Sequence, residues 1–180
     1  MSTDIPAITI MGATFSMHGW PEELITALDG HGLYVIRFDH RDTGQSSTVP
    51  LGQATYTVLN RMEDTLALLG AYGLPAHLVG MSLGGVIAQM FTVRHPERVD
   101  TVTLISSEPL GWDAPLLPYI SQVFLDGLTN IDWCDPHAMA QSLMQSERLS
   151  AGSGEGFDES QHTQRKLVPY IRHGQQPRGR

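Results

Sequence analysis

The sequence predicts an α/β protein in which a parallel sheet of about four strands is flanked by helices. Short runs rich in β-branched and apolar residues alternate with helix-like segments over residues 5–105, a pattern typical of sheets covered on both faces. The run LYVIRF at residues 33–38 is almost continuously apolar, as expected of a strand that is buried on both faces. The turn Gly-Met-Ser-Leu-Gly, residues 80–84, lies between a predicted strand and a predicted helix.

Proline and charge mark the ends of the predicted helices. Pro21 suits the first position of the first helix, where Glu22 and Glu23 favour the positive end of the helix dipole. The second helix carries a row of apolar side chains at helical spacing, and Pro75 and Pro96 follow the second and third helices. Strands are therefore predicted over residues 5–11, 33–38, 76–79 and 99–105, and helices over residues 21–29, 54–71 and 84–95.

The pattern changes after Ser106, where prolines become frequent and the strand signal ends. Two helix-like stretches follow at residues 116–128 and 136–149, and residues 150–156 have the Ser- and Gly-rich composition of a flexible linker. We therefore expect three parts: a sheet domain with the turn at 80–84 over residues 1–107, a helical cap or lid over residues 108–174, and a disordered tail over residues 175–180.

Composition excludes several classes of partner. The 11 basic and 19 acidic residues give a formal net charge of −8, which argues against a nucleic-acid partner. Cys134 is the one cysteine, so neither an intrachain disulfide nor a cysteine-rich metal site is expected. Residues 1–6 lack the basic region of a signal peptide, and no apolar run approaches the ~18 residues of a membrane span. These features predict a cytoplasmic protein with no membrane partner.

The turn at residues 80–84 has the pattern of a nucleophile turn. Gly80 and Gly84 flank Ser82 at two residues on either side, and their missing Cβ atoms allow a tight, strained turn between strand and helix. Such a turn leaves the serine exposed, with free N–H groups of the helix beside it to stabilise an oxyanion. The alternative is a glycine-rich turn whose serine caps the helix. The setting between strand and helix favours the nucleophile.

The order of the motifs resembles the α/β-hydrolase superfamily over residues 8–107. Residues 11–13 resemble its oxyanion loop, and DHRDTGQS at residues 39–46 resembles the D-x-R-G-x-G-x-S loop, with Asp42 and Thr43 where one glycine is commoner. Residues 80–84 resemble its nucleophile elbow, and residues 94–99 resemble the exit of the following helix. The fold class implied is a partial α/β-hydrolase fold with a helical cap segment.

Within the superfamily, residues 11–44 are most similar to aclacinomycin methylesterase-like carboxylic ester hydrolases, which act on polyketide-like compounds. This resemblance continues faintly around residues 156–158. It implies hydrolysis of a small hydrophobic ester through an acyl-enzyme, without a cofactor. Dehalogenases and epoxide hydrolases of the same fold are disfavoured, because they carry aspartate where this chain has Ser82. Perhydrolase or lyase chemistry on this fold stays open.

Site roles follow from the resemblance, position by position. Ser82 is expected to be the nucleophile, and the backbone N–H groups of Leu83 and Ala13 to form the oxyanion hole. Gly12 belongs to the oxyanion loop, as Gly80 and Gly84 belong to the nucleophile turn.

The loop at residues 39–46 carries two conspicuous charges. Asp39 and Arg41 are expected to brace this loop through a charge-assisted hydrogen bond rather than to act in catalysis. For His18, near the expected mouth of the pocket, contact with the substrate and a place on the surface are both open.

The acid and the histidine of a catalytic triad are not found in the chain. In this fold they follow the serine in the order acid, then histidine. Whole family members run to ~250–300 residues, and this chain has 180. His95 would lie a helix length from Ser82, at ~1.5 Å per residue. The remaining candidates lie in the appendage, and none is expected to join a triad or a metal site: His137, His162, His173, Asp126, Asp132, Asp135 and Asp158.

These absences, together with the four residues that precede Ile5 where the family usually has a β-hairpin, suggest a chain truncated at both ends. The resemblance then implies a sheet in the spatial order second, first, third, fourth strand. Its outer strands would then have unpaired edges, through which the protein could self-associate. The alternative function is a non-catalytic remnant, or a ligand-binding pseudoenzyme that lacks the acid and the histidine. Loss of the general base costs about 10⁶ in kcat in subtilisin, which makes this alternative a serious one.

Overall fold

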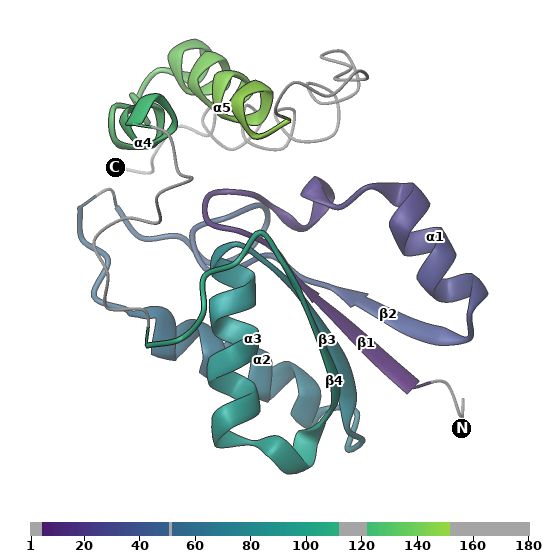
Figure 1. Cartoon of the computed structure of the whole chain (residues 1–180). Coiled ribbons are helices and arrows are strands. Elements are labelled where there is room, and N and C mark those ends of the chain that lie inside the picture. Colours follow the sequence, from purple (N-terminus) through teal and green to yellow (C-terminus); the bar gives the residue numbers. More distant parts are fainter. Residues whose placement is uncertain (1–4, 51, 112–121, 152–180) are drawn as a thin grey trace. The chain divides into compact units, whose positions relative to one another are not determined.

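The computed structural model describes residues 5–50, 52–111 and 122–151 and divides the chain into two compact units, Met1–Trp112 and Asp113–Arg180. The first unit holds the sheet, with β1 (Ile5–Ile10), β2 (Leu33–Arg37), β3 (Ala76–Met81) and β4 (Val99–Ile105). All neighbouring strands run parallel, in the order β2-β1-β3-β4 (Figure 1). The α/β fold class and the predicted strand order are therefore confirmed.

One face of the sheet carries the larger core. Ile8 and Ile10 of β1 and Leu78 of β3 are fully buried there, against α2 (Val58–Gly70) and α3 (Leu83–Arg94). Phe91 of α3 is also fully buried in this cluster. Burial of this apolar area is the main favourable term in folding, so it fixes α3 beneath the carboxyl ends of the strands.

The opposite face carries a smaller core around Met11, Trp20 and Val79. Leu24 of α1 (Glu22–Gly30) packs against it. Side chains of one strand alternate between the two faces, which explains why Ile10 and its neighbour Met11 belong to different cores.

Three details of the prediction are wrong. The helix predicted from residue 54 begins at Val58, because Thr57 is its N-cap and forms a capping box with Asn60. Pro21 is the N-cap of α1 rather than its first helical residue. The run at residues 33–38 is not buried on both faces, since β2 is an outer strand and Tyr34 is 49% exposed.

The second unit contains α4 (Gln122–Thr129) and α5 (Pro136–Ser150) within its described residues, and these helices pack against each other. The Asp135 side chain caps α5 by accepting from the His137 N–H at 2.8 Å. Residues 116–121 of the predicted first cap helix lie outside the described residues, as do the predicted tail and residues 152–156 of the linker. Within the described ranges, no helix has the length and apolar character needed to cross a bilayer.

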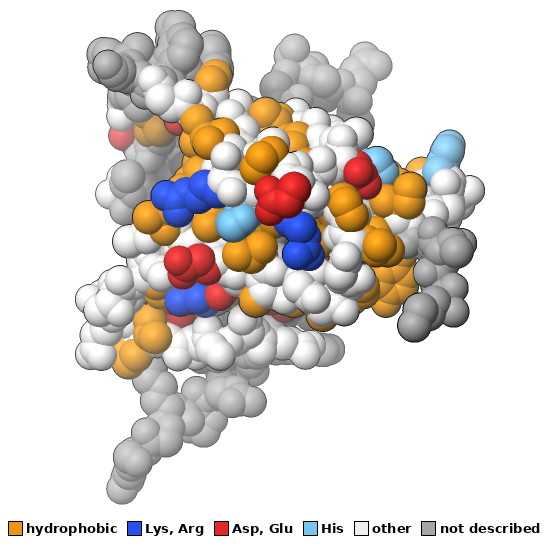
Figure 2. All heavy atoms as spheres, turned by 90° about the horizontal axis from the view of Figure 1, so that it is seen from below, with side chains coloured by type: hydrophobic (Ala, Val, Ile, Leu, Met, Phe, Trp, Pro, Cys, Tyr) orange, Lys and Arg blue, Asp and Glu red, His pale blue; other side chains and the backbone are white. Residues whose placement is uncertain are grey.

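Charge is distributed evenly on the face that Figure 2 shows. Basic and acidic side chains are interspersed there with apolar ones, and they form no single-sign patch on that face. In the first unit, Arg37 forms an ion pair with Glu22 at 2.6 Å.

Candidate active site

Ser82 occupies the turn between β3 and α3 in a strained backbone conformation. Its φ is 50° and its ψ is −119°, and the residue is exposed. A positive φ is unfavourable for a residue with a side chain and persists where the surroundings hold it in place. Here the Ser82 N–H donates to the Ile105 carbonyl at 2.9 Å, and the Ser82 carbonyl accepts from the Gly85 and Val86 N–H groups. The turn therefore holds an exposed serine directly after the carboxyl end of β3.

The turn requires three glycines because a Cβ would have no room at these positions, and not because their backbone dihedral angles are special. A Cβ on Gly80 would lie 2.5 Å from the Gly84 carbonyl oxygen, and one on Gly84 would collide with the Ile10 carbonyl oxygen. Neither glycine has a positive φ, so close approach of backbone to backbone requires both. Gly85, which the sequence prediction missed, would meet the Ser107 side chain. Its signal in the sequence is the glycine pair at residues 84–85.

The proposed oxyanion donors belong to the residue after Ser82 and to the loop that passes beside Ser82. Leu83 is the first residue of α3, where helix N–H groups have no partner within the helix. In the loop, a Cβ on Gly12 would lie 3.4 Å from the Ser82 Cβ, and Ala13 follows in an exposed position. Among the described residues, no oxygen accepts from the N–H of Leu83 or of Ala13. Thr14 has a φ of 70°, which makes this loop a second strained segment.

Asp39 connects two loops near the site. Its carboxylate accepts from the Met17 N–H at 2.6 Å and from the Gln45 N–H at 2.9 Å. Gly44, with a φ of 50°, leaves room for that carboxylate, because a Cβ there would overlap it. Asp39 thus joins the loop at residues 39–46 to the 3₁₀ turn η1 (Met17–Gly19). His18 lies in this turn, and its N–H donates to the Ser16 hydroxyl at 3.3 Å.

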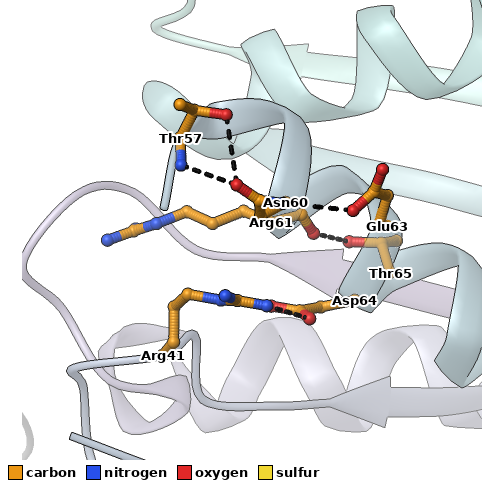
Figure 3. Close-up of polar contacts among 7 residues, drawn as sticks. All are labelled: Arg41, Thr57, Asn60, Arg61, Glu63, Asp64 and Thr65. Atoms are coloured by element: carbon orange, nitrogen blue, oxygen red, sulfur yellow. Dashed lines mark hydrogen bonds and ion pairs between the residues drawn. The ribbon is translucent and has the colours of Figure 1, made fainter. Parts of the chain in front are cut away.

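Arg41 binds the second helix rather than Asp39. Its guanidinium donates to both carboxylate oxygens of Asp64 in α2, at 2.9 and 2.5 Å (Figure 3). The hydrogen bonds to Asp64 raise the pKa of Arg41. Both arginines of this region, Arg41 and Arg61, lie over the Tyr56 ring at 5.1 and 5.3 Å, and the Tyr56 hydroxyl donates to Asp42. These contacts fasten the loop at residues 39–46 to the first turns of α2.

His40 is buried at the centre of this loop, with 1% of its surface exposed. Its Nε2 lies 3.1 Å from the Met11 carbonyl oxygen, and its ring meets Phe38 edge-on at 5.0 Å. Burial lowers the pKa of His40 from 6.5 to about 4, against the opposing effect of the Met11 carbonyl. Among nearby charges, Arg61 lowers this pKa further, while Asp64 and Asp39 raise it.

The described histidines do not complete a triad with Ser82. His95 caps the far end of α3, where it packs against Phe91 at 5.2 Å and lies 3.9 Å from Glu97. His137 begins α5 of the second unit. In the described part of the chain, the Ser82 side chain does not cap α3, and the histidine rings that form hydrogen bonds contact other residues. In the same residues, no group of three or more His, Cys, Asp or Glu could hold a metal. His162, His173 and Asp158 lie outside the described residues.

The strained serine turn, the glycine-lined approach and the parallel sheet together define an α/β hydrolase. Residues 8–153 match the family model described as the alpha/beta hydrolase fold. The chain therefore belongs to this family.

Two relatives of known activity show which members of the family the chain resembles. The chain is 34% identical over 184 residues to rhodomycin D methylesterase DnrP of Streptomyces peucetius, a match that covers 92% of this chain and 61% of that protein. It is 30% identical over 169 residues to 3-oxoadipate enol-lactonase 2 of Acinetobacter baylyi, covering 86% of this chain and 61% of that protein. The chain thus spans 61% of the length of these relatives. The predicted resemblance to methylesterases is confirmed.

Solved structures agree on the fold. The esterase RhEst1 from Rhodococcus sp. ECU1013 superposes with a TM-score of 0.70 at 21% identity, covering 97% of this chain and 65% of that one. A hydrolase from Pseudomonas aeruginosa gives a TM-score of 0.67 at 23% identity, covering 97% of this chain and 62% of that one.

Adding a methyl group at Gly84 tests the close approach at the turn. We expect Gly84→Ala to lower the free energy of unfolding by about 1–3 kcal/mol or more, because the Ile10 backbone must move. Gly70→Ala is the matched control, since Gly70 is the last residue of α2 and a Cβ there would meet nothing within 4 Å. That change should raise stability by up to about 1 kcal/mol. Urea unfolding measures both, and equal effects would contradict the tight approach.

The buried His40 predicts a dependence of stability on pH. An unfolded chain takes up a proton at His40 near pH 6.5, whereas the folded chain does so only near pH 4. The folded state therefore loses stability as pH falls through this window, by about 3 kcal/mol in all. His40→Gln removes this contribution, so the difference in unfolding free energy between wild type and variant should change across the window. If the unfolding free energies of wild type and variant change in parallel between pH 6.5 and pH 4, His40 is not held neutral in the folded chain.

Proposed function

We propose that this protein is a serine-dependent hydrolase of carboxylic esters, of the methylesterase kind. The observation that carries the proposal is the strained, exposed Ser82 between β3 and α3. Strain at an exposed serine is expected where the surroundings hold it for a reaction. The similarity to rhodomycin D methylesterase favours a methyl ester as the substrate.

In the proposed reaction, the Ser82 Oγ attacks the ester carbonyl carbon and gives up its proton to a general base. The carbonyl oxygen becomes an oxyanion, which accepts hydrogen bonds from the N–H groups of Leu83 and Ala13. Collapse of this intermediate breaks the bond to the alcohol, which takes the proton, and leaves an acyl-enzyme. Water then attacks the acyl group and releases the acid. Both tetrahedral intermediates need donors for the oxyanion, and the proposal is supported by Leu83 at the start of α3 and by Gly12, the neighbour of Ala13, against Ser82.

The general base sets the rate of this reaction. The histidine rings of the described residues that form hydrogen bonds contact Ala27, Met11 and Thr101 rather than the Ser82 hydroxyl, and a serine without a base is a weak nucleophile at neutral pH. This observation favours a second candidate, a protein that binds an apolar ester without turning it over.

We propose that the protein works in the cytoplasm under either function. Its single cysteine, Cys134, is exposed and free, which fits a reducing compartment.

Labelling by a fluorophosphonate separates the two candidates. A hydrolase should form a covalent adduct at Ser82 and release p-nitrophenol from p-nitrophenyl butyrate. Ser82→Ala should abolish both, whereas Ser47→Ala, at an exposed serine just after the loop at residues 39–46, should leave them unchanged. Mass spectrometry locates the adduct. Folded protein that binds the ester but carries no adduct would establish the binding role, and an adduct elsewhere would refute the assignment of Ser82.

We also propose that the protein self-associates through the edges of its sheet. Within the first unit, β2 and β4 are the outer strands, and Tyr34 and Leu104 on them are 49% and 45% exposed. Unpaired strand edges offer N–H and C=O groups to another chain.

A charge on the outer strand tests this proposal. Leu104→Lys puts a charge on β4 that opposes pairing with a strand of another chain, and it should shift the protein toward monomer in sedimentation equilibrium. Val93→Lys on α3, at a residue 75% exposed and outside the sheet, is the matched control and should not change the assembly. A monomeric wild type at the same concentration would contradict association through the edges.

A further inference from the structure

The Met11 carbonyl is a meeting point of three parts of the first unit. It follows the last residue of β1, and His40 of the next loop approaches it at 3.1 Å. On the α3 side, a Cβ on Gly84 would lie 2.8 Å from the same oxygen. One carbonyl therefore joins the end of the strand, the loop at residues 39–46 and the first turn of the nucleophile helix.

The direction of this carbonyl sets the start of the oxyanion loop. The peptide bond between Met11 and Gly12 is planar, so the Gly12 N–H points opposite to the Met11 C=O. Gly12 lies directly against Ser82, because a Cβ on Gly12 would be 3.4 Å from the Ser82 Cβ. A rotation of this peptide would therefore redirect Gly12 and, with it, the N–H of Ala13.

Neighbouring residues fix the position of the His40 ring. Thr43 donates to the His40 carbonyl twice, from its N–H at 3.0 Å and from its hydroxyl at 2.8 Å. Phe38 packs against the edge of the ring, and Asp39 and Arg41 on either side have their own partners on η1 and α2. The ring thus has little freedom to turn away from Met11.

The contact also determines which nitrogen of His40 carries the proton. A carbonyl oxygen only accepts, so Nε2 must donate to it. Nδ1 is buried and has no hydrogen-bond partner among the described residues, so it holds a lone pair in the neutral ring. The charged groups that face the ring are Arg61 and Asp64 on α2 and Asp39 on its own loop.

We propose that His40 is a positioning residue of the nucleophile site, whose Nε2–H holds the Met11 carbonyl and thereby aims the Gly12–Ala13 backbone at Ser82. His40 does not touch the substrate in this account. The proposal rests on the proposed function, because aiming Ala13 matters only if its N–H stabilises an oxyanion. A histidine that merely fills the core would need no particular tautomer and no particular hydrogen bond.

Nuclear magnetic resonance of the histidine rings tests the tautomer in the wild-type chain. Two-bond ¹H–¹⁵N correlations distinguish an Nε2–H ring from an Nδ1–H ring, and comparison with His40→Gln assigns the signal. We expect the His40 ring to be neutral at neutral pH, with its proton on Nε2. A His40 ring with its proton on Nδ1, or one that is protonated on both nitrogens at that pH, would overturn the proposal.

Two substitutions of His40 distinguish a residue that positions the Met11 carbonyl from one that only fills the core. His40→Met keeps the volume but removes the donor, whereas His40→Gln can still donate an N–H to Met11. We expect amide hydrogen exchange at the buried Gly12 to rise about tenfold in the methionine variant and to be largely rescued by glutamine. His31→Gln, the same change at an exposed histidine, is the control and should leave exchange at Gly12 unchanged. Equal exchange in the methionine variant and wild type would contradict the proposal.

The rate of fluorophosphonate labelling at Ser82 connects this contact to the site. It should fall about tenfold in the methionine variant and recover in the glutamine variant. If wild-type Ser82 is not labelled at all, the proposed hydrolase fails, while the tautomer and the amide exchange still decide the role of His40. If labelling proceeds equally in all variants and exchange is unchanged, His40 only fills the core.

Discussion

The site depends on the close approach of the first turn of α3 to the end of β1. Gly84 makes this approach possible, because any side chain there would collide with the Ile10 carbonyl. The approach brings Ser82 beside Gly12, and the hydrogen bond from the Ser82 N–H to the Ile105 carbonyl ties the turn to β4 as well. Three neighbouring strands thus end at one point, and a strained serine is held where they meet.

Strain at this point is opposed by the packing below it. Ser82 and Thr14 both have positive φ values, each of which costs of order 1–3 kcal/mol when the surrounding structure does not compensate. Ile87 and Phe91 of α3 are fully buried against the sheet, and each such side chain contributes about 1.5–3 kcal/mol on burial. The helix that presents the strained turn is therefore also one of the best anchored elements.

Much of the fold follows from local patterns, whereas the site depends on contacts that local patterns do not show. Alternating segments predict the parallel sheet, the resemblance to the α/β-hydrolase superfamily implies its strand order, and the glycines around Ser82 predict the turn. The start of α2 at Val58 escapes the sequence pattern because Thr57 and Asn60 cap the helix together. The partner of Arg41 is Asp64, 23 residues away, and His40 reaches Met11 across 29 residues. Such pairings arise only when the sheet brings the loops together.

The central claim is that Ser82 lies between two backbone donors aimed at one oxyanion. A crystal structure of the chain after reaction with a fluorophosphonate tests it most directly, because the phosphoryl oxygen stands in for the oxyanion. The account predicts a bond from phosphorus to the Ser82 Oγ, with the phosphoryl oxygen at about 2.7–3.1 Å from the N–H groups of Leu83 and Ala13. A phosphoryl oxygen that points to solvent, away from both groups, would contradict it.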